Sequence, residues 1–311
     1  MRYEKPFLSF NGQISLLKKR GLIIRDEQYA LLVLQNVSYY RLSAYMFPFQ
    51  QKESKEHKYK PDVSFEEIAS LYFFDRELRL LVFDAIERIE IAFRTQLVYR
   101  FSEKYGWNWF EESGLYNNRQ IFEKTIRKLD EEIKRSGELF IKHYQNKYGE
   151  PDNPPACMTI EITTAGLLAQ MYRGISMCDA KKEVAEYFGV HPYILESWIQ
   201  SMSYVRNICA HHSRLWNRVL TIKPTMPQKT NYAWIREKPI NDTKLYPLLC
   251  VLVYLIKVIN PNSHFTNKFH KLLHKYPDIK LNYMGFPSLW KEEEIWQENP
   301  VYTHIPKSDL D

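Results

Sequence analysis

Residues 64–104 carry a long helical pattern that constrains the fold of this 311-residue chain more than any other segment. Ser64 and Glu67 have the spacing of a capping box, which predicts that a helix begins here. Beyond them, Glu87, Glu90 and Arg94 share a polar stripe, which favours a solvated row of ion pairs over a functional cluster. The apolar residues recur at helical spacing and form one core face: Leu78, Leu81, Val82, Ala85, Ile89, Ala92, Phe93 and Leu97.

The rest of the chain also favours helices. Hydrophobic residues make up 45% of the sequence, which is enough for a sizeable core, and only 10 glycines are present. We therefore predict an all-α domain over residues 1–260, followed by a C-terminal extension over 261–311 that is packed or partly irregular. Further helical patterns cover 13–34 (in two parts), 117–148, 159–177, 180–188, 192–220 and 245–259.

Composition also limits the compartment and the partners. The four cysteines are widely spread and form no paired motif, which favours a reducing cytosol over a disulfide framework or a zinc site. The N-terminus has no apolar signal core. The apolar run 245–259 is too short to span a bilayer, so we expect a buried helix and a cytoplasmic protein without membrane contact. The net charge, 43 − 37 = +6, is compatible with a polyanionic partner.

One stretch combines residues that neither a surface helix nor a core helix needs: Tyr204–Arg218, "YVRNICAHHSRLWNR". If a helix continues through 198–219, each residue turns by about 100°. His212 then falls within an apolar arc, which predicts a core or near-core histidine with a hydrogen-bond partner. The other members of this arc are Trp198, Met202, Val205, Ile208, Cys209, Leu215, Trp216 and Val219. His211 instead falls on a polar face, with three neighbours of the same kind: Asn207, Arg214 and Arg218.

This polar face suits phosphate chemistry. Histidine can take or give a proton near neutral pH, and the arginine fork matches phosphate oxygens. The stretch contains no carboxylate for a catalytic triad or a metal. An RNA phosphodiester carries its own nucleophile, the 2′-hydroxyl, so its cleavage needs only a base, an acid and a cation. The residue types therefore indicate RNA rather than DNA.

The spacing raises a geometric difficulty. Arg206 and His211 diverge by about 140° on an ideal helix. Either the helix is distorted, or the long arginine reaches round it, or two copies of the helix assemble one site. The third option predicts a homodimer, and Phe83 and Phe101 of the long helix would supply apolar residues beside the site.

Several stretches together resemble the abortive-infection (Abi) proteins of the AbiD/AbiF type, within the HEPN ribonuclease superfamily. "RNICAH" (206–211) resembles the superfamily's Arg-x4-6-His motif in its Arg-Asn-x-x-x-His form. Residues 16–49 resemble the family's N-terminal signature, 74–97 its central helix and 154–175 its mid-chain motif. One departure is the lack of an aromatic residue near Cys157.

The resemblance implies an all-α, HEPN-like helical bundle with additional N-terminal helices and an irregular C-terminal tail. It implies a dimer in which two motifs share one cleft. The activity would be metal-independent and cofactor-free RNA cleavage by a phage-defence toxin, leaving 2′,3′-cyclic phosphate and 5′-hydroxyl ends. An RNA or protein antitoxin is a further candidate partner.

The resemblance also implies roles for individual residues. Arg206 would be the cation that stabilises the phosphate, and His211 the general base or acid. Asn207 would support the arginine. The variable gap of the motif also admits His212, which is therefore the second choice for the catalytic histidine.

Two other classes of function remain open. The first is an RNA-binding or regulatory HEPN module with little or no nuclease activity. Candidate RNA contacts come from arginines and aromatic residues: Arg214, Arg218, Tyr39, Tyr40, Arg41 and Trp216. The second is a metal enzyme, which is less favoured because adjacent histidines on a helix diverge by about 100°. Its ligands would be His191, Cys209, His211 and His212.

Overall fold

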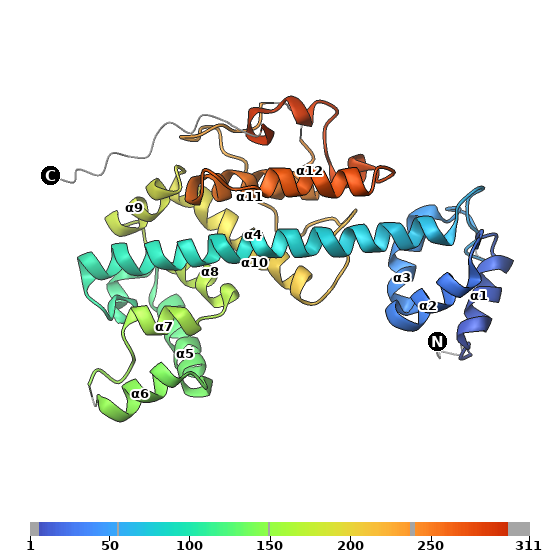
Figure 1. The fold of residues 1–311 in the computed structure, drawn as a ribbon. Helices are drawn as coiled ribbons and strands as arrows, with labels where there is room; N and C mark the ends of the chain where they lie inside the picture. The colour runs from blue at the N-terminus through green and yellow to red at the C-terminus, as the bar shows by residue number, and fades with distance from the viewer. Residues whose placement is uncertain (1–5, 55, 149, 237–239, 298–311) are drawn as a thin grey trace. The chain divides into compact units, whose positions relative to one another are not determined.

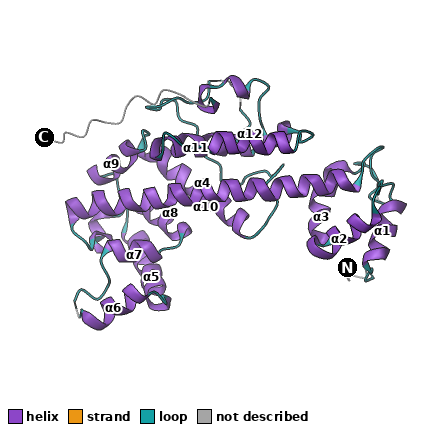
Figure 2. Ribbon diagram, in the orientation of Figure 1, coloured by secondary structure: helices purple, strands orange, loops and turns teal. Residues whose placement is uncertain are grey.

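The computed structural model describes residues 6–54, 56–148, 150–236 and 240–297, and Figure 1 shows the course of the chain. Regular structure in this part of the chain is helical, as Figure 2 shows, apart from isolated bridges such as Ile23–Ser64. The predicted all-α class is confirmed. The α-helices are α1 (Phe10–Lys19), α2 (Glu27–Val37), α3 (Tyr39–Met46), α4 (Phe65–Tyr105), α5 (Arg119–Arg135), α6 (Leu139–Lys147), α7 (Ala156–Ile162), α8 (Ala165–Gly174), α9 (Asp179–Tyr187), α10 (Pro192–Ala210), α11 (Leu245–Ile259) and α12 (Phe265–Lys275).

The chain divides into two compact units. Unit 1 contains residues 1–80 and 270–279, and unit 2 contains residues 81–269 and 280–311. Helices α4 and α12 contribute residues to both units. The division at residue 260 that the sequence suggested stays a prediction.

Helix α4 begins where the capping box predicts. The backbone N–H of Glu67 donates to Ser64 Oγ at 3.2 Å, which satisfies one of the free N–H groups of the first turn. Six of the eight residues of the predicted apolar face are buried, and Leu81 and Ala92 are half-buried. Phe101 is also fully buried and packs on Trp109, with 4.6 Å between ring centroids. The predicted place of Phe101 beside a dimer interface is therefore wrong.

Unit 1 contains a buried ionic network. Tyr45 Oη donates to Asp75 Oδ2 at 2.5 Å, and Arg79 donates to the same carboxylate oxygen and, at 3.1 Å, to Tyr45 Oη. Burial raises the pKa of Tyr45 far above its ordinary value, and the negative charge of Asp75 raises it further. The tyrosine therefore stays a donor. The buried carboxylate is paired and hydrogen-bonded, as a charge in a protein core requires.

In unit 2, α10 packs against α8, α9 and α11. Helix α11 has the predicted bounds and is buried along most of its length. Lys257 lies in this apolar environment and donates to the carbonyl oxygens of Ile295 (2.7 Å) and Gln297 (3.0 Å). Burial lowers its pKa to about 8. In the described part of the chain, no helix has both the length and the apolar character that a membrane span requires.

Two predicted helices are interrupted. The pattern over 117–148 divides into α5 and α6 at residues 136–138, and the pattern over 159–177 divides into α7 and α8. At the second break, Thr164 caps α8 by accepting a hydrogen bond from the N–H of Leu167 at 3.4 Å. A threonine side chain competes for backbone groups in this way, so it favours a helix end over a helix interior.

Candidate functional site

Helix α10 ends at Ala210, inside the predicted motif, so the continuous helix over 198–219 is wrong. His211 is the C-cap, and its N–H still donates to the carbonyl of Asn207 at 3.0 Å. His212 has φ +56°, the left-handed conformation that commonly follows a helix end. Its N–H donates to the carbonyl of Cys209 at 3.0 Å. Residues 211–220 therefore form a loop.

The loop places the two histidines differently from the prediction. Both side chains are exposed, so the predicted core position of His212 is wrong. The apolar arc was expected to continue through Val219, which is in fact 59% exposed. Leu215 and Trp216 are buried as predicted, but from a loop rather than from a helical face. Exposure therefore does not distinguish His211 from His212. The two residues differ in backbone position, because His211 is the C-cap of α10 and His212 is the left-handed residue after it.

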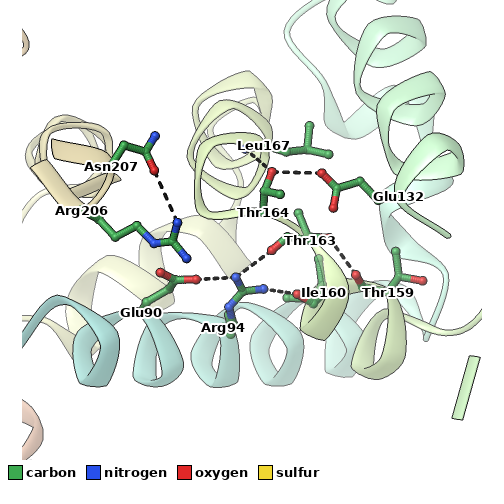
Figure 3. Close-up of polar contacts among 10 residues, drawn as sticks. All are labelled: Glu90, Arg94, Glu132, Thr159, Ile160, Thr163, Thr164, Leu167, Arg206 and Asn207. Atoms are coloured by element: carbon green, nitrogen blue, oxygen red, sulfur yellow. Dashed lines mark hydrogen bonds and ion pairs between the residues drawn. The ribbon is translucent and has the colours of Figure 1, made fainter. Parts of the chain in front are cut away.

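Arg206 lies in the last full turn of α10 and is partly exposed. Its Nη1 donates to Asn207 Oδ1 at 3.4 Å (Figure 3). Its guanidinium carbon lies 5.7 Å from the centre of the Phe83 ring on α4, within the range of a cation–π contact. Two neighbours therefore limit the orientation of this arginine.

Glu90 of α4 also lies at this site, although its polar stripe favoured a solvated row of ion pairs. Figure 3 shows the guanidinium of Arg206 turned towards its carboxylate. Glu90 accepts a hydrogen bond from Arg94 at 2.5 Å. Its place beside Arg206 could not be read from the sequence, because Arg206 lies on another helix.

Arg94 is buried, so the predicted solvated row is wrong at this residue. It donates to the carbonyl of Ile160 and, at 2.7 Å, to the carbonyl of Thr163. Both carbonyls lie at the C-terminal end of α7, where that of Ile160 also accepts from the N–H of Thr163 at 3.3 Å. Arg94 thus ties α4 to α7 and holds Glu90 in place beside Arg206.

The loop arginines have separate surroundings. Arg218 Nη1 donates to the carbonyl of Arg214 at 3.2 Å. Arg218 also bonds with Tyr204, as does Thr221. Burial by itself raises the pKa of Tyr204, but these hydrogen bonds and the charge of Arg218 outweigh it, so the pKa is lowered. Arg218 is therefore partly occupied in holding the loop against α10.

The other candidate RNA contacts differ in accessibility. Tyr40 and Arg41 lie on α3 in unit 1, where both are exposed, Tyr40 by 88%. Tyr39 accepts a hydrogen bond from Arg20 at 2.8 Å. Trp216 is buried and packs on Tyr283, with 5.2 Å between ring centroids, so it cannot stack on a base. Of the three aromatic candidates, Tyr40 is the most accessible.

The four metal ligands considered from the sequence do not come together. His191 is the N-cap of α10, where its Nδ1 accepts a hydrogen bond from the N–H of Tyr193 at 3.3 Å. His211 caps the opposite end, and a rise of 1.5 Å per residue separates the two caps by about 30 Å. Across the described ranges, no three His, Cys, Asp or Glu side chains gather in a way that could hold a metal ion.

The fold and the site define an all-α protein in which an arginine and an exposed histidine flank the end of one helix. The chain belongs to the family of Abi-like proteins, whose family model matches residues 32–217, more than half of its length. The resemblance to Abi proteins is thus confirmed, and the membership indicates a role in abortive infection, a defence against phage. Comparison with curated proteins and with solved structures gave no match.

Proposed function

We propose that this chain is a metal-independent endoribonuclease of the HEPN type, a toxin that cleaves cytoplasmic RNA during abortive infection. The observation that carries the proposal is the end of α10. An oriented, partly exposed arginine and an exposed histidine lie there, five positions apart, within an Abi-like protein. An RNA or protein antitoxin would restrain such a toxin until infection.

The proposed reaction uses only groups of the RNA and side chains of the protein. His211 takes the proton of the 2′-hydroxyl as the 2′-oxygen attacks phosphorus. The bond from phosphorus to the 5′-oxygen breaks, and that oxygen receives a proton from a general acid. The products are a 2′,3′-cyclic phosphate and a 5′-hydroxyl. General acid–base catalysis of this kind contributes roughly 10²–10⁴-fold to a rate.

Arg206 would stabilise the negative charge that develops on the phosphoryl oxygens. Its contacts support this role, because Asn207 and Phe83 restrict the guanidinium before substrate arrives. The carboxylate of Glu90 is paired with Arg94, and Figure 3 shows the guanidinium of Arg206 turned towards it. We assign Glu90 the role of a positioning residue.

The proposed cleft is built from two copies of the chain. A histidine that has taken a proton from the 2′-hydroxyl cannot donate a different proton in the same step, and the partner copy would supply a second histidine. A two-fold axis brings the same surface of both copies together. Helix α4 offers exposed apolar residues in unit 2, with Ile91 54% and Tyr99 56% exposed.

The reaction class is tested with purified protein, total RNA and excess chelator. We expect cleavage that is insensitive to the chelator, with products whose 3′ ends carry cyclic phosphate and whose 5′ ends accept phosphate from a polynucleotide kinase. Matched DNA should stay intact, because it lacks the 2′-hydroxyl. Binding of RNA without cleavage would contradict the proposal and favour the RNA-binding or regulatory module.

The dimer is tested by mixing variants. An excess of His211→Ala protein should lower the activity of wild-type protein beyond simple dilution, because most wild-type chains then sit in mixed dimers. Mixing Arg206→Ala with His211→Ala protein should restore no activity if both arginines and both histidines are needed. Recovered activity would show that one arginine and one histidine from opposite chains suffice, and would contradict the need for a second histidine. Sedimentation at the working concentration provides the control. A monomer that still cleaves RNA would refute the composite cleft.

A further inference from the structure

The loop after α10 is fixed against the segment that precedes α11. Leu215 and Trp216 are buried, and the N–H of Leu220 donates to the carbonyl of Thr243 at 2.7 Å. Asn217 has φ +52°, a conformation that asparagine tolerates better than most residues. The polar side chains of the loop therefore project from a backbone with a defined course.

The side chain of Lys244 contacts this loop. Its Nζ donates to Asn217 Oδ1 at 2.8 Å, and the side chain is partly buried. Gly285 makes the approach possible, because a Cβ atom at this position would lie 2.6 Å from Lys244 Cβ. Gly285 also has φ +84°, which disfavours any other residue. The position of Lys244 is thus built by two segments distant in the sequence.

Lys244 has two positive neighbours, Arg214 and the N-terminus of α11. Burial lowers its pKa, and the positive charge of Arg214 lowers it further. Helix α11 begins at the next residue without a side-chain cap, and a helix N-terminus carries partial positive charge that opposes a cation. The described hydrogen-bond partner of Lys244 is a neutral amide. Such an arrangement costs stability unless an anion joins it.

We propose that Arg214 and Lys244 form a phosphate-binding subsite for the RNA chain, next to the phosphate that is cleaved. The subsite rests on the proposed function for its ligand. Arg214 is three residues from His211, so their backbones lie at most about 10 Å apart. Arg218 is assigned to holding the loop, because it donates to the Arg214 carbonyl.

The subsite is tested by RNA binding rather than by cleavage. A fluorescent 2′-O-methyl RNA cannot be cut, and its affinity is measured by anisotropy over a range of salt concentrations. Loss of one phosphate contact should reduce the slope of log affinity against log salt by about 0.7. We therefore expect Lys244→Gln to bind about fivefold more weakly than wild type at 0.1 M salt. Lys244→Arg should keep the wild-type slope.

Lys223→Gln is the matched control. Lys223 is an exposed lysine of the same unit whose charge is already paired with Asp242 at 2.6 Å, so its loss should leave the slope unchanged. Circular dichroism checks that each variant is folded. A wild-type slope in Lys244→Gln would overturn the subsite, and so would failure of wild-type protein to bind the RNA.

A second arm separates RNA phosphates from free phosphate. Inorganic phosphate that raises the Tm of wild type but not of Lys244→Gln, together with unchanged RNA binding, would show a free-phosphate site and contradict the proposal. The chelator experiment with cleavable RNA is independent of both the RNA-binding measurement and the phosphate measurement. If that experiment shows no cleavage while Lys244→Gln still has the reduced salt slope, the nuclease proposal fails, and Arg214 and Lys244 remain a site for RNA phosphate only.

Discussion

Replacement of His211 by alanine is expected to abolish RNA cleavage and cell toxicity while leaving the fold intact. The proposed acid–base role accounts for about 10²–10⁴-fold in rate. The side chain is exposed, so its removal opens no cavity, and the N–H that closes the last turn of α10 belongs to the backbone and is kept. Cleavage rate, colony formation on induction and Tm measure the three parts of this expectation.

The neighbouring histidine supplies the control for this experiment. His212 has a left-handed backbone that asparagine tolerates, so His212→Asn preserves the turn while removing the imidazole. We expect His212→Asn to keep its activity. Undiminished toxicity in a strain carrying His211→Ala would reject the assignment. Loss of activity in His212→Asn at an unchanged Tm would identify His212 as the catalytic histidine.

Replacement of Arg206 by lysine is expected to lower the cleavage rate by about 10²–10³-fold, although the charge is kept. Lysine lacks the planar fork that can hold two phosphoryl oxygens at once. It also alters the contacts with the Phe83 ring and with Asn207 Oδ1. Single-turnover cleavage of a defined RNA measures the loss.

The comparison variant for Arg206 is Arg88→Lys. Arg88 lies on α4 in an ion pair with Asp84 at 2.7 Å, and neither residue belongs to the site. This variant should cleave at the wild-type rate. Near-normal cleavage by Arg206→Lys would mean that Arg206 acts as a distant charge or a structural residue, and the role of phosphate ligand would have to be withdrawn.

The helices whose ends carry strong local signals could be predicted from the sequence. Helix α4 begins after Ser64, whose hydroxyl caps it, and α11 matches its apolar run at both ends. In both cases a local pattern predicts the helix: α4 has one apolar face, and α11 is apolar along most of its length. The buried face of α4 also follows directly from its periodicity.

The end of α10 could not be predicted in this way. No glycine or proline marks residues 211–213, and the apolar spacing continues through Leu215 and Trp216. Those two residues are buried, but they reach the core from a loop that is held by contacts such as that between Trp216 and Tyr283. Apolar residues at helical spacing are thus buried by tertiary packing, although the segment that carries them is a loop.

The surroundings of Arg206 were hidden for a different reason. The spacing of Glu90 and Arg94 predicts an ion pair along one helix, and that pair exists. Its burial against α7 and its position beside Arg206 depend on how three helices pack. Lys244 was overlooked for the same reason, since Asn217 and Gly285 approach it from remote parts of the chain.

The helix end between Arg206 and His212 has a consequence for insertions. Within a continuous helix, one inserted residue swings every later side chain round the axis by about 100°, so a catalytic spacing could not vary. Here the helix ends at Ala210, and His212 has the left-handed backbone conformation. The direction of a histidine that follows the helix end is set by the backbone torsions of the loop. An added residue therefore lengthens the loop and does not rotate the histidine about the helix axis. In the proposed nuclease, the spacing between Arg206 and the catalytic histidine can therefore vary without loss of the site.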